Sequence, residues 1–357
     1  MRQRPFGSRV TAARVRAALA LLLLAAVAAL IAGPVGSGSA VAWQQVRPAG
    51  RTLCGRGGPF AFWARLASPE RLLIYFEGGG FCWDYRSCAP ASSLFKDQVS
   101  DKEDPGVHGM GILDLSNPRN PFHDWSVLYV PSCTGDLYAG DSTRSYRSAA
   151  RTVAIHHRGH VNASAALDWV FERVPRPGRV VVAGCSAGSV GSILHAPRVI
   201  ERYPEARVAQ VGDSLGYLSG TSHELWPWRT YAVLPDWIPT VRLLRNGRLA
   251  VPRFYDAVAA YYPKSTFAQV NFRHDAVQRA YFEAAGGRPE DFDGTLRDNL
   301  AEIRADTPNF RSCLLDGSDH CALASADFYR LRSGEITLHG WIADLAAGRP
   351  VPDLPLA

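Results

Sequence analysis

Apolar runs of strand length alternate along the chain with segments that have helical spacing. Arg71–Glu77 and Trp125–Pro131 are short apolar runs, and Arg179–Gly184 contains three consecutive valines. Runs of this length, bounded by glycine or proline, predict strands that are buried on both faces. Gly188–Arg202 predicts a helix directly after the valine run, and Ala206–Asp213 predicts a further strand. The alternation indicates an α/β fold with a mostly parallel central sheet and helices on both faces.

Two other segments complete the predicted organisation. Val153–Val174 has helical apolar spacing and is followed by a break at Pro175-Arg-Pro-Gly178. Over residues 221–269, prolines and large aromatics gather without a sheet pattern, which predicts an insertion that caps a substrate cleft. The alternative is ordinary helical packing by large aromatic side chains. These aromatics are Trp226, Trp228, Trp237, Tyr255, Tyr261 and Tyr262.

The amino terminus has the three-part pattern of an export signal. Five arginines precede the 16-residue apolar run Ala17–Ala32, and small residues continue to Ala40-Val41-Ala42, which resembles a cleavage site. The sequence therefore predicts a signal peptide over residues 1–42, one domain over residues 43–357, and a secreted protein. An uncleaved anchor is the alternative, although the run is shorter than the roughly 20 residues that span a bilayer. No later apolar run is long enough for a membrane span.

Composition and charge narrow the functional classes. The 357 residues are 47% hydrophobic and 20% charged, which is typical of a globular domain and excludes disordered, collagenous and coiled-coil chains. The net charge is +6, but residues 1–42 contain five arginines and no acid, so the remainder carries only +1. No basic stripe remains in the body of the chain. We therefore expect no nucleic-acid partner.

The seven cysteines predict disulfides, because export leads into an oxidising compartment. Their spacing indicates two local bridges, Cys82–Cys88 and Cys313–Cys321. A third bridge, Cys54–Cys133, stays an open alternative, and Cys185 is expected to be the unpaired thiol. A zinc site would compete for these residues. The chain has neither a C-x2-C pair nor a four-ligand spacing, so no metal is expected.

The pentapeptide Gly184-Cys185-Ser186-Ala187-Gly188 is the strongest chemical signal in the chain. It fits the G-x-S-x-G pattern, and it lies between the valine-rich strand and the helix that follows. A strand–turn–helix context is where a nucleophile elbow belongs, with the serine side chain exposed at the helix amino terminus. A small-residue turn without function is the alternative. The context favours Ser186 as a nucleophile.

A second motif supplies what a serine nucleophile needs. The strand ending in Glu77-Gly78-Gly79-Gly80-Phe81 is similar to the glycine-rich loop whose backbone N–H groups form an oxyanion hole in lipases and esterases. The amide of Ala187, directly after the nucleophile, is the expected second donor. A triple glycine alone would be only a flexible turn, but its place upstream of the elbow strengthens both motifs.

A histidine base and an acid should follow the nucleophile in the order Ser, acid, His. His320 is favoured among the later histidines by its late position, its loop setting and the predicted Cys313–Cys321 bridge around it. The others are His195, His223, His274 and His339. Spacing alone does not choose the acid. The candidates are Asp213, Asp275, Asp291, Asp306 and Asp319.

Six ordered motifs over about residues 45 to 345 resemble the pectin acetylesterase and Notum family of carboxylesterases. They are LIYFEGGGFCWDYRSC, VPSCTGDLYAGD, HHRGHVNASAALDWV, GCSAGSVGS, FRHDAVQ and SC…DHC. The resemblance implies an α/β-hydrolase fold and a triad without metal or other cofactor. By motif it assigns Ser186 as nucleophile, Asp275 as acid and His320 as base, with Gly79, Gly80 and Ala187 as oxyanion donors. Gly80 stands where several members have Trp, which bears on substrate size.

The expected function is a secreted serine esterase that removes acetyl groups from a polysaccharide such as pectin. A longer acyl chain, as removed by Notum, is the second enzymatic alternative. A catalytically idle binding protein on the same fold is the alternative from another class. The partner expected in each enzymatic case is an ester substrate, either an acylated carbohydrate or another ester.

Overall fold

The structure, a computed structural model, describes residues 41–214, 216, 228, 232–244, 251–284 and 286–354. Nearly all of the expected signal segment lies outside these ranges. Residues 221–227, 229–231 and 245–250 of the expected insertion also lie outside them, and with them Trp226 and the candidate His223. Ala42–Ala357 forms one compact unit. Within the described ranges, no helix has the length and apolar character needed to cross a membrane.

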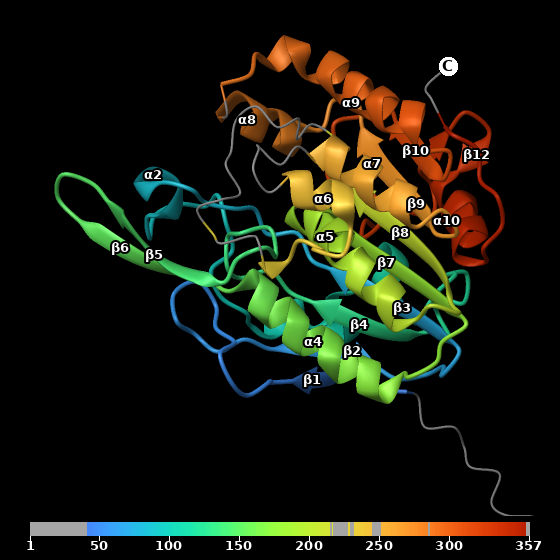
Figure 1. Ribbon diagram of the computed structural model, residues 1–357, viewed down its shortest axis with the longest axis horizontal. Helices are drawn as coiled ribbons and strands as arrows, with labels where there is room; N and C mark the ends of the chain where they lie inside the picture. The colour runs from blue at the N-terminus through green and yellow to red at the C-terminus, as the bar shows by residue number, and fades with distance from the viewer. Residues whose placement is uncertain are drawn as a thin grey trace, which may run out of the picture. The chain divides into compact units, whose positions relative to one another are not determined.

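An eight-stranded sheet forms the centre of this unit (Figure 1). The strand order is β1-β2-β4-β3-β7-β8-β9-β10; β2 pairs antiparallel with both of its neighbours, and all other pairs are parallel. The mostly parallel sheet is therefore confirmed. The strands are β1 (Gln44–Val46), β2 (Phe62–Arg65), β3 (Arg71–Phe76), β4 (Ser126–Val130), β7 (Arg179–Cys185), β8 (Arg207–Asp213), β9 (Thr266–Phe272) and β10 (Phe310–Leu315).

Helices cover the sheet because alternate side chains of each buried strand point to opposite faces. Leu72 and Ile74 of β3 pack with α4 and part of α5, whereas Leu73 and Tyr75 pack on the side of α10. The two faces of a strand therefore carry two separate apolar clusters. The helices are α2 (Tyr85–Cys88), α3 (Pro105–His108), α4 (Gly159–Arg173), α5 (Ala187–Arg202), α6 (Pro239–Leu244), α7 (Val251–Tyr261), α8 (Ala276–Ala284), α9 (Phe292–Asp306) and α10 (Leu338–Ala346).

Shorter elements connect these layers. The 3-10 turns are η1 (Asp101–Glu103), η2 (Gly111–Leu113) and η5 (Pro289–Asp291), and a small two-stranded sheet joins β11 (Arg332–Ser333) to β12 (Ile336–Thr337). A second two-stranded sheet, β5 (Ser142–Arg147) with β6 (Thr152–His157), forms a hairpin that extends away from the central sheet (Figure 1).

The hairpin corrects the helix predicted over Val153–Val174. Residues Thr152–His157 are a strand, and helix α4 begins only at Gly159. The physical reason is a period-two pattern in which Ile155 and His157 are buried, whereas Ala154 is exposed and His156 is partly exposed. Ile155 packs with the bridge Cys82–Cys88 and Phe95, and this contact fixes the buried face of the hairpin. The remainder of the prediction, up to Arg173, is helical.

The boundary of the predicted insertion also needs correction. Strand β9 begins at Thr266, so the last residues of the expected segment 221–269 belong to the central sheet. Tyr255 of α7 is buried, and its hydroxyl accepts a hydrogen bond from Gln210 of β8. Phe254 and Tyr255 of α7 therefore belong to the core, as in ordinary helical packing, whereas Tyr261 at the end of the helix is exposed.

Candidate active site

Ser186 lies at the turn from β7 into α5, at the carboxyl edge of the sheet. Its backbone is left-handed, with φ of 54°, which costs a non-glycine residue about 1–3 kcal/mol. The turn is held because the Ser186 N–H donates to the Asp213 carbonyl at 2.8 Å, and the Ser189 N–H donates to the Ser186 carbonyl at 2.8 Å. Ala187 begins helix α5, so its N–H has no acceptor within the helix. The geometry is that of a nucleophile elbow.

Glycines at 184 and 188 are required because the elbow presses against β3. A Cβ built on Gly188 would lie 2.0 Å from the carbonyl oxygen of Phe76, and one built on Gly184 would lie 2.1 Å from that of Gly188. Both contacts are with backbone, which cannot move aside as a flexible side chain could. The same close approach brings the glycine loop after β3 next to the elbow, since a Cβ on Gly78 would meet that of Ser186 at 3.2 Å.

His320 and Asp275 form a hydrogen-bonded pair. Asp275 follows β9 and His320 follows β10, and these parallel neighbours end at the same edge of the sheet. Nδ1 of His320 lies 2.8 Å from Oδ2 and 3.0 Å from Oδ1 of Asp275. The carboxylate is fully buried, and it also accepts hydrogen bonds from the N–H groups of Val277 and Gln278 at the start of α8. Asp275 is thus held rigidly while it orients the imidazole.

The other acids considered from the sequence have different surroundings. Asp306 and Asp319 are exposed, and Asp291 pairs with Arg288. Asp213, at the end of β8, accepts the N–H of Leu323 at 2.7 Å and the hydroxyl of Ser214. Burial raises the pKa of Asp213 to about 6. Of these carboxylates, Asp275 is the one with a hydrogen bond to His320.

One cavity of about 450 Å³ joins these elements. Ser186 and His320 line it together with the glycine loop Gly78–Gly80, and a smaller recess beside Ser186 is lined by Phe81, Ala187 and Tyr281. The lining of the larger cavity also includes the polar residues Lys102, Glu103, Asp104 and His108. The expected nucleophile, base and oxyanion loop are therefore brought together around one space.

A cluster of charged side chains is connected to the glycine loop. Glu77 forms an ion pair with Lys96 and accepts a hydrogen bond from the N–H of Ser132. Nζ of Lys96 also lies 3.1 Å from Oε1 of Glu103. Burial raises the pKa of Glu77. Because the N–H of Lys96 donates to the carbonyl of Gly79 at 2.8 Å, the cluster is tied directly to the loop.

Comparison with known proteins identifies the family. Residues 41–226 match the family model described as Pectinacetylesterase, which is just over half of the chain. The chain belongs to the pectinacetylesterase family. Palmitoleoyl-protein carboxylesterase NOTUM of Mus musculus is 25% identical over 179 residues, 48% of this chain and 35% of that protein. Pectin acetylesterase 11 of Arabidopsis thaliana is 27% identical over 151 residues, 42% of this chain and 37% of that protein. The alignments thus span little more than a third of each relative.

Solved structures agree on the fold of this pectinacetylesterase-family chain. The Wnt deacylase Notum from Drosophila superposes with a TM-score of 0.64 at 18% identity, covering 88% of this chain and 97% of that one. A second crystal form gives a TM-score of 0.63. The α/β-hydrolase fold predicted from the sequence is therefore confirmed.

The disulfides of this family member correct part of the prediction. Bridges join Cys82 to Cys88 and Cys54 to Cys133, which confirms the first and decides the second, open pair. The predicted Cys313–Cys321 bridge is wrong, because Cys185 is bonded to Cys321 and Cys313 is a buried free thiol. Cys313 lies inside strand β10, in register with Val270, and the loop after the strand then folds back toward β7. Short separation in sequence was a poor guide to distance here.

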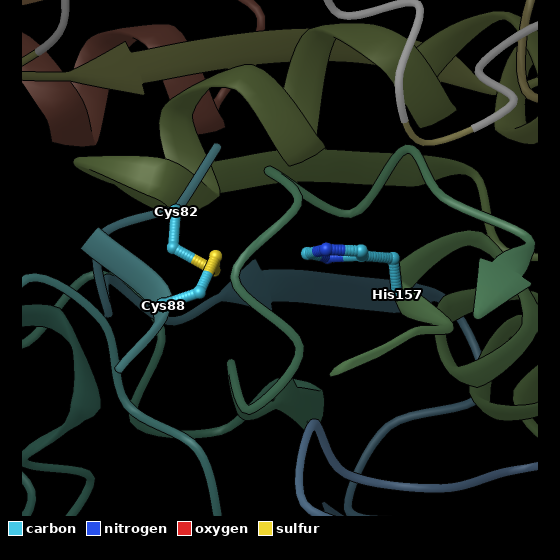
Figure 2. Close-up of side chains that lie close together, drawn as sticks. All are labelled: Cys82, Cys88 and His157. Atoms are coloured by element: carbon cyan, nitrogen blue, oxygen red, sulfur yellow. A yellow bond between two sulfur atoms is a disulfide. The ribbon is translucent and has the colours of Figure 1, made fainter. Parts of the chain in front are cut away.

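Two groups of side chains resemble metal sites but are accounted for otherwise. The first group is the Cys82–Cys88 disulfide with His157 beside it (Figure 2). The second group consists of Cys185, His320 and Cys321. In both groups the sulfurs bond to each other, so neither provides a thiolate ligand. Both ring nitrogens of His157 are also engaged, with the Thr134 carbonyl and the Tyr146 hydroxyl. Burial lowers the pKa of His157 to about 3, which keeps the ring neutral.

Sequence reasoning missed the Cys185–Cys321 bridge, although a signal for it existed. Cys185 directly precedes Ser186, and Cys321 directly follows His320. Once the serine and the histidine are assigned to one site, the two cysteines must lie close together as well. Asp213 and Ser214, which hold the backbone after His320, had no comparable signal, because their contacts depend on the path of a distant loop.

Proposed function

We propose that this chain is a serine carboxylesterase that removes acetyl or similarly short acyl groups from a polysaccharide such as pectin. The observation that carries the proposal is the cavity lined by Ser186, His320 and the glycine loop, with Asp275 hydrogen-bonded to His320. Membership of the pectinacetylesterase family supports ester hydrolysis as the reaction class.

In the proposed mechanism, Ser186 attacks the ester carbonyl while His320 accepts its proton. Asp275 holds the Nδ1–H of the imidazole and stabilises the charged form of the ring. The alcohol leaves with the proton from His320, and an acyl-enzyme remains on Ser186. Water, activated by the same histidine, then releases the acid. No step requires a metal or another cofactor.

The negative charge on the carbonyl oxygen would be held by backbone N–H groups of Gly79, Gly80 and Ala187. Fixed donors aimed at a developing oxyanion typically contribute a factor of about 10²–10³ each to the rate. Gly80 has φ of 65°, and a Cβ there would lie 2.0 Å from the Leu94 carbonyl oxygen. A side chain at this position would therefore displace the loop.

Two features of the cavity support a short acyl group on a polar alcohol. Tyr281 stacks on Phe81 with ring centroids 5.1 Å apart, and its hydroxyl donates to the Leu94 carbonyl. This anchored pair forms a fixed wall of the recess beside Ser186, which leaves little room for a long chain. The lining of the larger cavity includes Lys102, Glu103 and other polar groups, which suit a hydroxyl-rich carbohydrate.

The test measures initial rates on p-nitrophenyl esters from acetate to palmitate, beside acetate release from acetylated pectin and acetylated xylan. We expect the highest rate with acetate and a drop of about tenfold or more by octanoate, because added methylenes meet the Tyr281 wall. Tyr281→Ala should move the optimum toward longer chains. A maximum at palmitate would instead favour Notum-like chemistry. No turnover of any ester, together with polysaccharide binding, would favour an idle binding protein.

Export by residues 1–42 belongs to the same proposal. The sequence pattern supports it, and three disulfides in the described residues are consistent with an oxidising compartment. Expression of the full chain, followed by amino-terminal sequencing of the protein in the medium, tests it. We expect a mature terminus close to Trp43. Retention in the membrane fraction would favour the anchor.

A further inference from the structure

The loop that carries His320 reaches back across the edge of the sheet. Residues 316–324, named here the base loop, follow β10, whereas Ser186 follows β7. In the sheet β10 and β7 are separated by β9 and β8, so three strand spacings, or roughly 14 Å, divide the two strand ends. The base loop must therefore be held against the ends of other strands to bring its histidine to the nucleophile.

The base loop is attached in turn to the ends of β9, β8 and β7. Near β9, the N–H of Ala276 donates to the Ser318 carbonyl, and Asp275 binds the imidazole. At β8, the Ser214 hydroxyl accepts the N–H of Cys321 at 3.0 Å. At β7 the attachment is covalent, because Cys321 is bonded to Cys185. The bridge is thus the attachment at the strand farthest from β10 and the one next to the nucleophile.

The bridge is one residue from the nucleophile and one residue from the base. A ring nitrogen of His320 and the two sulfurs of the bridge lie within 4.8 Å of one another. Cys321 has φ of 70°, and Ser186, the neighbour of Cys185, has φ of 54°. An unfavourable left-handed backbone thus occurs on both sides of the bridge. Such conformations persist only where the surroundings impose them.

We propose that the Cys185–Cys321 disulfide is a positioning device that sets the distance between His320 and Ser186, and that its reduction switches the esterase off while the fold persists. The inference rests on the proposed function. Asp275 orients the imidazole ring, but it does not determine how far the base loop reaches toward β7. The covalent attachment to Cys185 sets that distance.

A dithiol reductant can reach this bridge from the substrate side. Both Cys185 and Cys321 line the cavity, and Cys321 is partly exposed. The dithiol supplies two electrons and two protons: the S–S bond breaks, Cys185 and Cys321 become thiols, and the reductant closes into its own disulfide. Burial raises the pKa of the neighbouring free Cys313 to about 12, so it stays a thiol and does not exchange with the bridge at neutral pH.

The other two bridges are matched controls. The cysteines of Cys54–Cys133 and Cys82–Cys88 are at most 1% exposed, and none of them lines the cavity. Reduction under native conditions should therefore open Cys185–Cys321 first. Alkylation and peptide mapping during a dithiothreitol titration would show which thiols appear as activity is lost.

The decisive experiment compares the double variant Cys185→Ala with Cys321→Ala against Cys82→Ala with Cys88→Ala. For p-nitrophenyl acetate we expect the first to lower kcat about 10- to 100-fold with KM changed less than about twofold, because a displaced base slows chemistry rather than binding. Labelling of Ser186 by a fluorophosphonate should slow in parallel. Circular dichroism should show both variants folded, and the Cys82/Cys88 variant should keep its kcat.

Three results would overturn the inference. The first is a Cys185/Cys321 variant that keeps at least half of the wild-type kcat. The second is a loss of activity that only follows the folded fraction, which would make the bridge merely structural. The third is wild-type inactivation that follows reduction of another bridge. A wild-type protein that hydrolyses no ester and reacts with no fluorophosphonate would instead overturn the proposed function, and the switch with it.

Discussion

The elbow, residues 184–188, and the base loop reach the same cavity by opposite physical routes. The elbow is determined locally, since a valine-rich strand, a helix and two glycines with no room for a Cβ force Ser186 into its turn. The base loop has no such local cause. It is held by a carboxylate after β9, a hydroxyl after β8 and a sulfur on β7. A candidate nucleophile can therefore be proposed from a pentapeptide, whereas the position of the candidate base depends on contacts distant in sequence.

The largest expected effect tests the elbow. Ser186→Ala should lower ester hydrolysis on the order of 10⁴-fold or more, because it removes the attacking oxygen, while the melting temperature stays close to wild type. Rates on p-nitrophenyl acetate with the purified protein check this. Near-normal turnover by the variant would show that the elbow does not carry the nucleophile.

The second effect tests which carboxylate serves the base loop. Asp275→Asn should lower kcat on the order of 10³- to 10⁴-fold, because the amide no longer holds the imidazole in the required tautomer. Asp319→Asn is the matched control, since Asp319 is adjacent to His320 but exposed, and its effect should be mild. The opposite ranking of the two variants would transfer the acid role to Asp319.

The difference between these regions also explains how much the sequence revealed. Strands β3, β4, β7 and β8 and helix α5 were predictable, because apolar runs and the G-x-S-x-G pattern are local properties. His320 and Asp275 were assigned by resemblance, and spacing alone left five acids open. The Cys313–Cys321 pairing failed because Cys313 is fixed inside extended β10, so the cysteine nearest in sequence is not the nearest in space. Likewise, Thr152–His157 became a strand because a distant disulfide supplies its packing surface.

The third prediction concerns a variant that changes the geometry of the elbow but keeps Ser186. Gly188→Ala places a Cβ 2.0 Å from the Phe76 carbonyl oxygen and 2.7 Å from that of Glu77, so α5 must move away from the glycine loop. We expect kcat to fall about 10- to 100-fold and the free energy of unfolding to fall by about 1–3 kcal/mol. Activity and chemical denaturation measure the two effects.

Gly294→Ala is the matched control for that variant. Gly294 also lies near the start of a helix, but a Cβ there meets nothing within 4 Å. This change should leave kcat unaltered and raise the free energy of unfolding by up to about 1 kcal/mol, since alanine favours helix. Equal behaviour of the two alanine variants would remove the steric argument for the elbow.

The smallest effect on turnover concerns Asp213, which holds the backbone of the base loop rather than its histidine. Asp213→Asn keeps an oxygen acceptor for the Leu323 N–H, so kcat should change less than about tenfold. Its effect on stability should depend on pH. Burial raises the pKa of Asp213 from 3.8 to about 6, so the folded protein binds this proton more tightly than the unfolded chain. The carboxyl group thus adds stability below about pH 4, and this contribution is lost as pH rises through about 6.

The asparagine variant has no such titration, so the two proteins should diverge with pH. The free energy of unfolding of the wild type, minus that of Asp213→Asn, should fall by about 2 kcal/mol between pH 4 and pH 7. Urea denaturation at both pH values measures it. A difference that stays flat would mean that Asp213 titrates alike in both states. Keeping the Asp213 carboxylate ionised would then not lower the free energy of unfolding. The base loop and the locally determined elbow would then not differ in this pH-dependent contribution to stability.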